Sequence, residues 1–523
     1  MRDASSMRAD ADVGERRAPA LGRTDLFVIA FLAVLATALR APGLVEHGLY
    51  RDDAWVALSS RTDAATAMRF GSTIPGYELL IGLWGRISIA TVWMQAPALF
   101  ASVVAVIGVY LLARRLDCSR AAALVAAGAL ALSPQAIVFA TRVKSYSTDS
   151  LFTVLILAAA VRVLERQDWR RWFALGSVAV VTALMSASVL PVTIAAVGWC
   201  GISGTLAAHR AHVKGGGWLR QPAVVVTVGY AAFVVVFAFG VLTTVSPSLR
   251  LYWTDYFVSS PSSALTALDR FAEGLGHRAG FVGAIALVAV CVGAFASRPR
   301  VAPLLVGPVA LALLLAVAQR APFGGGRTDI YLYPCVAVAA GLSLDRYLVP
   351  RLPVPGRDQV VGVAALLVAL AATLGRHALE ATPYPSADVG QLSRLVEQQR
   401  MPGDAVVVAP FTRYAYALYA DPSPIVVLSD KYSTGFTVAS SDPDVLIMPA
   451  ESYEAGYSPT VVDAASAGRD RVWYLATDTP AYDTPSDVEA TEFDGEQRLL
   501  ANGFTIDKRL DVQGAHADLL VRH

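Results

Sequence analysis

Apolar blocks of about twenty residues, rather than short periodic groups, run through most of the first 376 residues of this chain. An α-helix of that length crosses the hydrocarbon core of a bilayer. Only 16% of the 523 residues are charged, whereas a soluble protein carries about 25%. The sequence therefore predicts a polytopic α-helical membrane protein. The formal net charge of +1 gives no basis for nucleic-acid binding.

The loops between the apolar blocks sort into two sets by charge. Short arginine-rich loops such as "ARRLDCSR" and "VRVLERQDWRR" are cytoplasmic by the positive-inside rule. We therefore expect a cytoplasmic N-terminal segment, 1–24, and an extracytoplasmic C-terminal tail. About eleven spans are expected, near 25–42, 94–112, 121–140, 148–164, 172–187, 190–207, 222–244, 280–296, 301–318, 331–347 and 359–376.

Two segments on the predicted outer side are too large to be simple connectors. The outer loop 43–93 belongs to the membrane domain 25–376, and its stretch "YELLIGLWGRISIATVW" predicts helices lying on the membrane surface. The tail, 377–523, alternates short β-type runs ("DAVVVAP", "PIVVLSD", "DRVWYLATD", "ADLLVRH") with helical ones ("DVGQLSRLVEQQR", "DGEQRLLANG"). This alternation predicts a compact extracytoplasmic α/β domain.

The outer loop carries an acidic pair, Asp52 and Asp53, in the stretch "YRDDAWVALSSR" beside Trp55. One interpretation is structural, because an aspartate before an apolar helical run caps the free backbone N–H groups. The other is functional, because ionisable groups close to a membrane are costly and mark sites. Adjacent helical residues point about 100° apart, so only one of the two acids can face a given site.

A second cluster lies in the hairpin "ATRVKSYSTDS" and contains Arg142, Lys144, Tyr146 and Asp149. Two cations at the outer membrane edge suit a phosphate, which arginine binds with two hydrogen bonds and lysine as a point charge. The alternative is interfacial snorkelling of basic side chains.

A third cluster follows the glycine-rich loop in "FGGGRTDIYLYP" and contains Arg327, Asp329 and Tyr331. A glycine-rich loop lets an anion approach the backbone closely. The stretch lacks the nucleotide-binding P-loop pattern. A structural Arg327–Asp329 pair is the alternative.

A carboxylate opposite several cations can take a proton from a hydroxyl while the cations hold a phosphate leaving group. The three clusters thus favour transfer of a group from a lipid phosphate. A transporter or flippase for a lipid-linked or anionic precursor is the alternative function, and a non-catalytic scaffold is a third.

Four stretches carry a resemblance to a known family: "YRDDAWVALSSR", "STIPGYELLIGLW", "ALSPQAIVFATRVKSYSTDSL" and "GRTDIYLYP". The chain resembles the GT-C superfamily of polyprenyl-phosphate-sugar-dependent glycosyltransferases, in particular bacterial protein O-mannosyltransferases and aminoarabinose transferases. The resemblance implies a GT-C fold in a bacterial inner or plasma membrane. It also implies an inverting transfer of a sugar from a polyprenyl phosphate to a glycan, lipid or protein of the envelope.

The resemblance assigns roles to individual residues. Asp52 takes the place of the family's catalytic base and Asp53 that of the acid beside it. Lys144, Tyr146 and Arg327 take the places of donor-phosphate ligands, with Arg142 beside them. Substrate contacts are expected from five further side chains: Trp55, Glu78, Asp149, Asp329 and Tyr331.

The chain departs from the family pattern in four places. Asp53 is shorter than the family's glutamate, and Lys144 replaces an arginine. No basic residue precedes Pro75, and Glu78 is an additional acid. No cofactor is required by this reading, but the paired carboxylates Asp52 and Asp53 leave open a divalent ion, Mg²⁺ or Mn²⁺.

Overall fold

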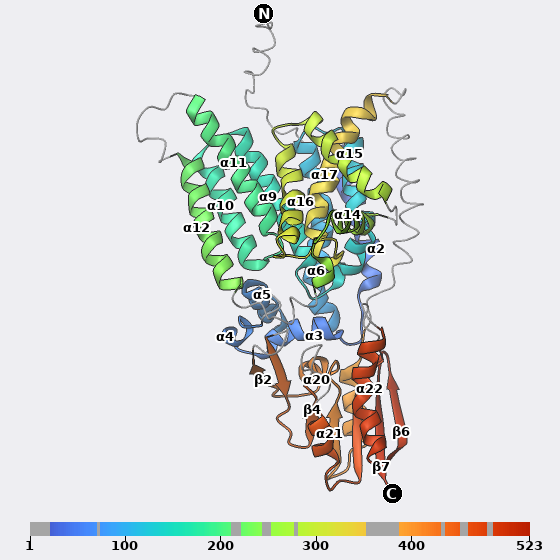
Figure 1. Cartoon of the computed structure of the whole chain (residues 1–523). Coiled ribbons are helices and arrows are strands. Elements are labelled where there is room, and N and C mark those ends of the chain that lie inside the picture. The colour runs from blue at the N-terminus through green and yellow to red at the C-terminus, as the bar shows by residue number, and fades with distance from the viewer. Residues whose placement is uncertain are drawn as a thin grey trace, which may run out of the picture.

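A bundle of long helices is joined through a layer of short helices to an α/β domain in the computed structural model (Figure 1). The structure describes residues 21–70, 74–210, 221–242, 253–276, 281–351, 386–429, 435–449, 459–478 and 485–523. The last predicted span, 359–376, lies outside these residues.

The bundle contains a helix at each of the other predicted spans. Its helices are α2 (Arg23–Arg40), α6 (Thr91–Arg115), α7 (Arg120–Leu132), α8 (Pro134–Val138), α9 (Tyr146–Glu165), α10 (Trp169–Met185), α11 (Leu190–Arg210), α12 (Pro222–Leu242), α14 (Pro261–Leu275), α15 (Phe281–Ser297), α16 (Ala302–Val317) and α17 (Tyr333–Tyr347). Within the described residues, 5 helices are long and apolar enough to cross a membrane, and α15 and α16 are shorter apolar helices. The predicted number of spans therefore stays a prediction.

The predicted span 121–140 is one bent element. Helix α7 ends before Pro134 and the chain turns by 60° into α8, because proline lacks an N–H and clashes with the preceding turn. The buried Arg40 side chain donates to the carbonyls of Leu130 and Ala131 at 3.1 and 3.0 Å. Arg40 thereby satisfies acceptors that the break leaves open.

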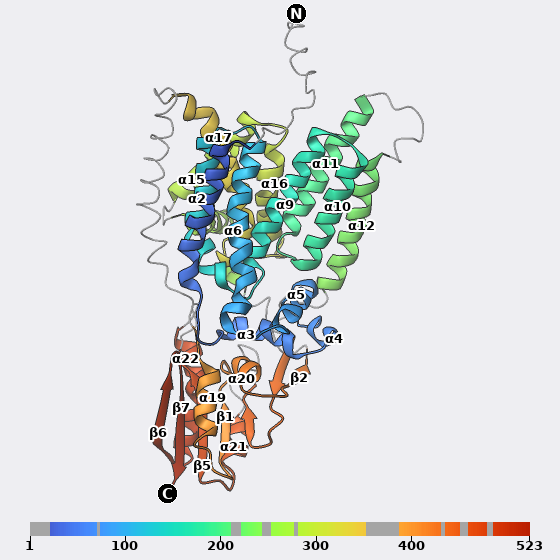
Figure 2. The ribbon, with the colours of Figure 1, turned by 180° about the vertical axis from the view of Figure 1, so that it is seen from behind.

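Short helices form the layer between the bundle and the α/β domain in both views (Figures 1 and 2). They are α3 (Arg51–Ala57), α4 (Ala64–Ala67) and α5 (Pro75–Gly85). Helix α4 is capped by Asp63, which accepts from two backbone N–H groups, and α5 begins at Pro75, where a missing N–H costs nothing.

The tail folds into a sheet with helices on both faces. The strand order is β4 (Val445–Ile447), β1 (Ala405–Val408), β5 (Arg471–Thr477), β7 (Ala515–Arg522), β6 (Phe504–Val512). Strand β1 is parallel to β4 and β5, whereas β7 is antiparallel to β5 and β6. Strands β2 (Ile425–Leu428) and β3 (Phe436–Ala439) form a separate antiparallel pair. The helices are α19 (Val389–Glu397), α20 (Arg413–Tyr419), α21 (Pro459–Ser466) and α22 (Pro485–Ala501).

The tail and the outer loop share one hydrophobic core. This core includes Leu49, Val56 and Phe70 from the loop and Tyr414 and Phe436 from the tail. The rings of Phe70 and Phe436 stack with centroids 3.9 Å apart. Burial of apolar surface across this contact holds the tail in a defined place on the short-helix layer.

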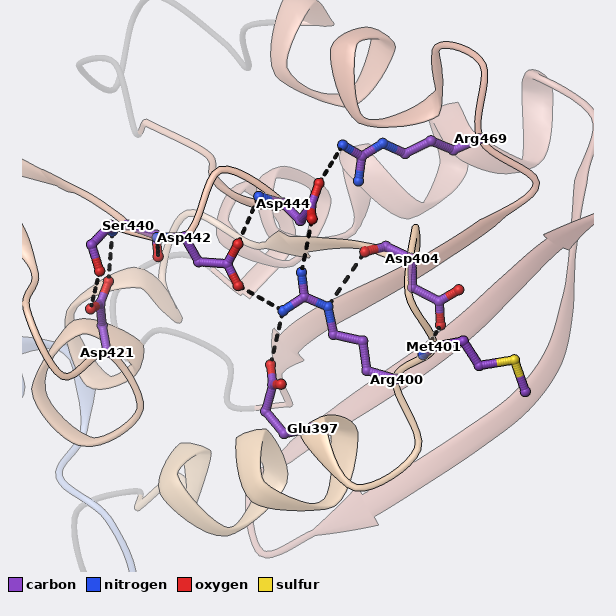
Figure 3. Close-up of polar contacts among 10 residues, drawn as sticks. Glu397, Arg400, Met401, Asp404, Asp421, Ser440, Asp442, Asp444 and Arg469 are labelled. Carbon is purple, nitrogen blue, oxygen red and sulfur yellow. Dashed lines mark hydrogen bonds and ion pairs between the residues drawn. The ribbon is translucent and has the colours of Figure 1, made fainter.

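Arginines and acids form a cluster of ion pairs at the β4 edge of the sheet (Figure 3). Arg400 donates to Glu397 and Asp442 at 3.2 and 2.8 Å, and Arg469 donates to Asp444 at 2.7 Å. Each of these acids has an arginine partner, so the cluster is an ionic network that ties α19 to the loop before β4.

Candidate active site

Asp53 is held in place by the 140–150 hairpin. The residue is 3% exposed, and its Oδ1 accepts from Arg142 Nε and Val143 N, both at 2.9 Å. Arg142 Nε also lies 2.8 Å from Asp53 Oδ2. Burial raises the pKa of Asp53, and the Arg142 guanidinium limits the rise. This pair fixes α3 against the hairpin.

Asp52 has a different environment from its neighbour. The residue before α3 is Tyr50, which makes no side-chain cap bond, so the interpretation of Asp52 as a helix cap is wrong. In the described part of the chain the Asp52 carboxylate has no hydrogen bond and no ion pair within 4 Å. Burial raises its pKa, but Lys144, Arg51, Arg142 and Arg327 together lower it to about 2. Asp52 is therefore an ionised carboxylate with unused acceptor positions among four cations.

Lys144 lies between the acids and an aromatic ring. Its Nζ sits 3.4 Å from the centroid of the Trp55 ring, and the side chain is 7% exposed. Burial lowers the pKa of Lys144 to about 8, while Asp52, Asp53 and Glu78 oppose the change. The lysine therefore loses its charge in a range close to physiological pH.

Glu78 on α5 is fully buried, and neither of its carboxylate oxygens has a hydrogen-bond partner. Burial raises the pKa of Glu78 well above its usual value, and Lys144 lowers it in part. The Ser59 hydroxyl donates to Val56 O at 2.7 Å. It also lowers the pKa of Glu78. Tyr77, the preceding residue, is buried within electrostatic range of Asp53 and Asp149.

Arg327 reaches the same region from a distant part of the sequence. It opens a short 3₁₀ turn, η6 (Arg327–Leu332), after Gly326, whose φ is +63°. This left-handed conformation suits glycine. The Arg327 guanidinium lies 5.3 Å from the Trp253 ring centroid and contributes to the low pKa of Asp52. Tyr146, at the start of α9, packs edge-on against Phe139.

The remaining expected residues, Asp149, Asp329 and Tyr331, are buried. Asp149 accepts from Ser145 Oγ at 3.1 Å, and its other oxygen is buried without a partner. Asp329 is buried, which raises its pKa to about 7 against the effect of the backbone N–H groups of the glycine loop. Tyr331 is buried within electrostatic range of both acids.

The tail adds Phe411 and Arg413 to this region, neither of which the sequence singled out. The Arg51 guanidinium stacks 3.8 Å above the Phe411 ring. The Trp55 and Tyr414 rings lie 6.3 Å apart. Arg413 is 3% exposed, its Nε and one terminal nitrogen are buried without a partner, and its guanidinium covers the Tyr414 ring at 4.4 Å. A basic residue before a buried aromatic helix was the signal available in "APFTRYAYALY".

The acidic pair is a poor fit for the divalent ion that the sequence left open. Asp53 Oδ1 accepts two hydrogen bonds, and both Asp53 oxygens face Arg142 Nε. Lys144 and Arg142 add positive charge where a cation would sit. Mg²⁺ and Mn²⁺ prefer oxygen ligands that are free to coordinate, and of this pair Asp52 alone has both oxygens without a hydrogen bond to a described residue.

Comparisons with known proteins agree with the architecture. Residues 75–239 match a family model described as dolichyl-phosphate-mannose-protein mannosyltransferase. The crystal structure of ArnT from Cupriavidus metallidurans in the apo state is similar, with a TM-score of 0.54 and 12% identity over 94% of this chain and 97% of that chain. The same protein bound to undecaprenyl phosphate gives a TM-score of 0.55 and 13% identity over the same shares. No curated protein sequence matches the chain.

Proposed function

We propose that this chain, a member of the GT-C superfamily of glycosyltransferases, moves a sugar from a polyprenyl phosphate to a hydroxyl of a cell-envelope acceptor. The reaction takes place on the outer face of a bacterial plasma membrane, with the N-terminus inside and the tail outside. The similar ArnT structure holds undecaprenyl phosphate, which supports a lipid-linked donor of this class. Neither the fold nor the site favours a transporter.

The observation that carries this proposal is the contrast between the two adjacent acids. Asp53 is committed to Arg142 and the hairpin, while Asp52 is ionised and unbonded among four cations. We assign the general base to Asp52 and the support of the loop to Asp53. Lys144 and Arg327 are the donor-phosphate ligands in this scheme, because Arg142 already serves Asp53.

In the proposed reaction the acceptor oxygen bonds to the anomeric carbon as the bond from that carbon to the phosphate oxygen breaks. The acceptor proton passes to Asp52, and polyprenyl phosphate leaves with the bonding electron pair. Attack from the side opposite the phosphate inverts the anomeric carbon. Lys144 and Arg327 stabilise the charge that grows on the departing phosphate.

A carboxylate with a pKa near 2 is a weak base, and the donor itself corrects this. The cations that lower the pKa of Asp52 include the two assigned to the phosphate. When the anionic phosphate binds them, their effect on Asp52 is cancelled and its pKa rises. The base thus becomes stronger only when the donor is in place.

The test is Asp52→Asn, which keeps the shape of the side chain and removes the base. In a deletion strain, mass spectrometry of envelope glycans and glycolipids identifies the missing sugar, and the wild-type chain restores it. We expect Asp52→Asn to reduce transfer by about 10²–10⁴-fold, the usual contribution of a general base.

Glu46→Gln is the matched control, because Glu46 is an exposed acid of the same outer loop. That variant should restore the sugar fully, at a protein level equal to that of Asp52→Asn in immunoblots. Normal transfer by Asp52→Asn would exclude Asp52 as the base.

A further inference from the structure

Three side chains of metal-ligand type converge in the tail, away from the acidic pair. One ligand atom each from Glu496, His516 and Asp518 lies within 4.8 Å of the other two, and all three residues are buried. His516 and Asp518 are two positions apart on β7, so they project from the same face of the sheet. Glu496 reaches that face from α22.

His516 is oriented as a ligand would be. Its Nδ1 bonds to the carboxylate of Asp478. Its Nε2 is buried, has no hydrogen-bond partner and lies 3.8 Å from Asp518 Oδ2. A carboxylate that holds the Nδ1 proton leaves the Nε2 lone pair free to coordinate, which is the usual arrangement behind a metal-bound histidine. The Phe493 ring stacks on the imidazole and holds its plane.

The carboxylates of the cluster outnumber its arginines. Glu496, Asp518 and Asp478 contribute three negative charges, and Arg509 contributes one positive charge through its paired bonds to Asp518. With the neutral His516 that coordination requires and with all three acids ionised, the cluster would carry an excess of two negative charges, which a divalent ion cancels. Arg509 takes one lone pair on each Asp518 oxygen, and each oxygen keeps another.

The arginine network next to β4 shows what a purely ionic cluster in this tail looks like (Figure 3). There Asp442 and Asp444 are each paired with an arginine. That network contains no histidine. The cluster at α22 differs from it because it contains a buried imidazole nitrogen without a partner.

We propose that Glu496, His516 and Asp518 bind a divalent transition-metal ion that clamps α22 to β7. One imidazole with two carboxylates suits Zn²⁺ or Mn²⁺. Ligand atoms about 2.1 Å from a tetrahedral ion stand roughly 3.4 Å apart, so the 3.8 Å pair needs little movement. The clamp also steadies Glu492, one turn earlier on α22, which accepts from the Phe411 backbone N–H at 2.8 Å.

The test measures metal content and thermal stability of the full-length protein in detergent. The protein is purified through a tag without histidines, treated with a chelator, and dialysed against micromolar Zn²⁺ or Mn²⁺. Elemental analysis should then find one retained equivalent of one of these ions per chain. Restoring that ion should raise the thermal midpoint of the chelated protein.

The variants His516→Gln and Glu496→Gln separate the site from adventitious binding. Both should lose the retained equivalent and the stabilisation by metal. Glu496→Gln keeps the β7 strand unchanged, so it remains informative if His516→Gln folds poorly. His47→Gln is the control, because His47 is an exposed histidine, and it should bind metal like the wild type. Absence of a retained ion in the wild type, or equal retention in Glu496→Gln, overturns the proposal.

Discussion

Lys144 should make the binding of a lipid phosphate depend on pH above neutrality. Its pKa of about 8 means that about a tenth of the side chains stay charged at one pH unit above that value. A phosphate monoester has its second pKa near 6, so its charge is constant in this range. The affinity for undecaprenyl phosphate should therefore fall as pH rises through 8, because the free protein loses the ammonium charge.

The size of the effect follows from the contact that is lost. A hydrogen bond to a charged group contributes about 1.5–3 kcal/mol, which corresponds to roughly ten- to hundredfold in Kd. The same contact raises the pKa of Lys144 in the complex by about one to two units. Kd should thus rise about tenfold per pH unit above 8 and level off near pH 9–10.

The assay is quenching of tryptophan fluorescence by undecaprenyl phosphate between pH 7 and 10, since Trp55 lies directly under the Lys144 ammonium. Lys144→Arg should remove the pH dependence, because an arginine stays charged over this range. Lys508→Arg is the control, because Lys508 is an exposed residue bonded to Gln399, and its profile should match the wild type. A flat wild-type profile, or an unchanged slope in Lys144→Arg, would refute the reasoning.

Two further substitutions test the supports of the site, both by thermal unfolding of the purified protein. Asp53→Asn leaves Arg142 as a buried cation without its counter-charge and should lower the free energy of unfolding by on the order of 3 kcal/mol. Asp52→Asn removes no hydrogen bond and should unfold like the wild type. Equal midpoints for the two variants would contradict the assignment. Arg40→Ala should destabilise the bundle by about 1–3 kcal/mol, because the carbonyls of Leu130 and Ala131 lose their donor. An unchanged midpoint would show that these acceptors find other partners.

Local patterns in the sequence were sufficient for much of the fold. The apolar blocks predicted the bundle helices except α14, which falls between the predicted spans 222–244 and 280–296. They succeeded elsewhere because the requirement for about twenty apolar residues acts on each segment alone. Alternating runs likewise predicted β1, β2, β5 and β7. Strand β6 was missed because it is an edge strand with a mostly exposed, polar sequence. Strands β3 and β4 are too short to show an alternation of apolar and polar residues.

The sequence also predicted that Asp52 and the cations Lys144 and Arg327 belong to one region, since an acidic pair and scattered cations near a membrane have few inexpensive explanations. The chemistry of that region stays a prediction. The different environments of Asp52 and Asp53 could not be predicted from the sequence. They depend on Arg142, 89 positions away, and on cations from the hairpin and from η6.

The sequence by itself determined that the chain has apolar helices of membrane-spanning length, where these helices begin and end within a few residues, and which stretches carry charge. Tertiary structure decided which acid is free, that the tail packs on the outer loop, and that Glu496, His516 and Asp518 meet. Hydrophobic periodicity is a property of one segment, whereas ion pairs and shared cores arise between segments whose approach no local pattern records.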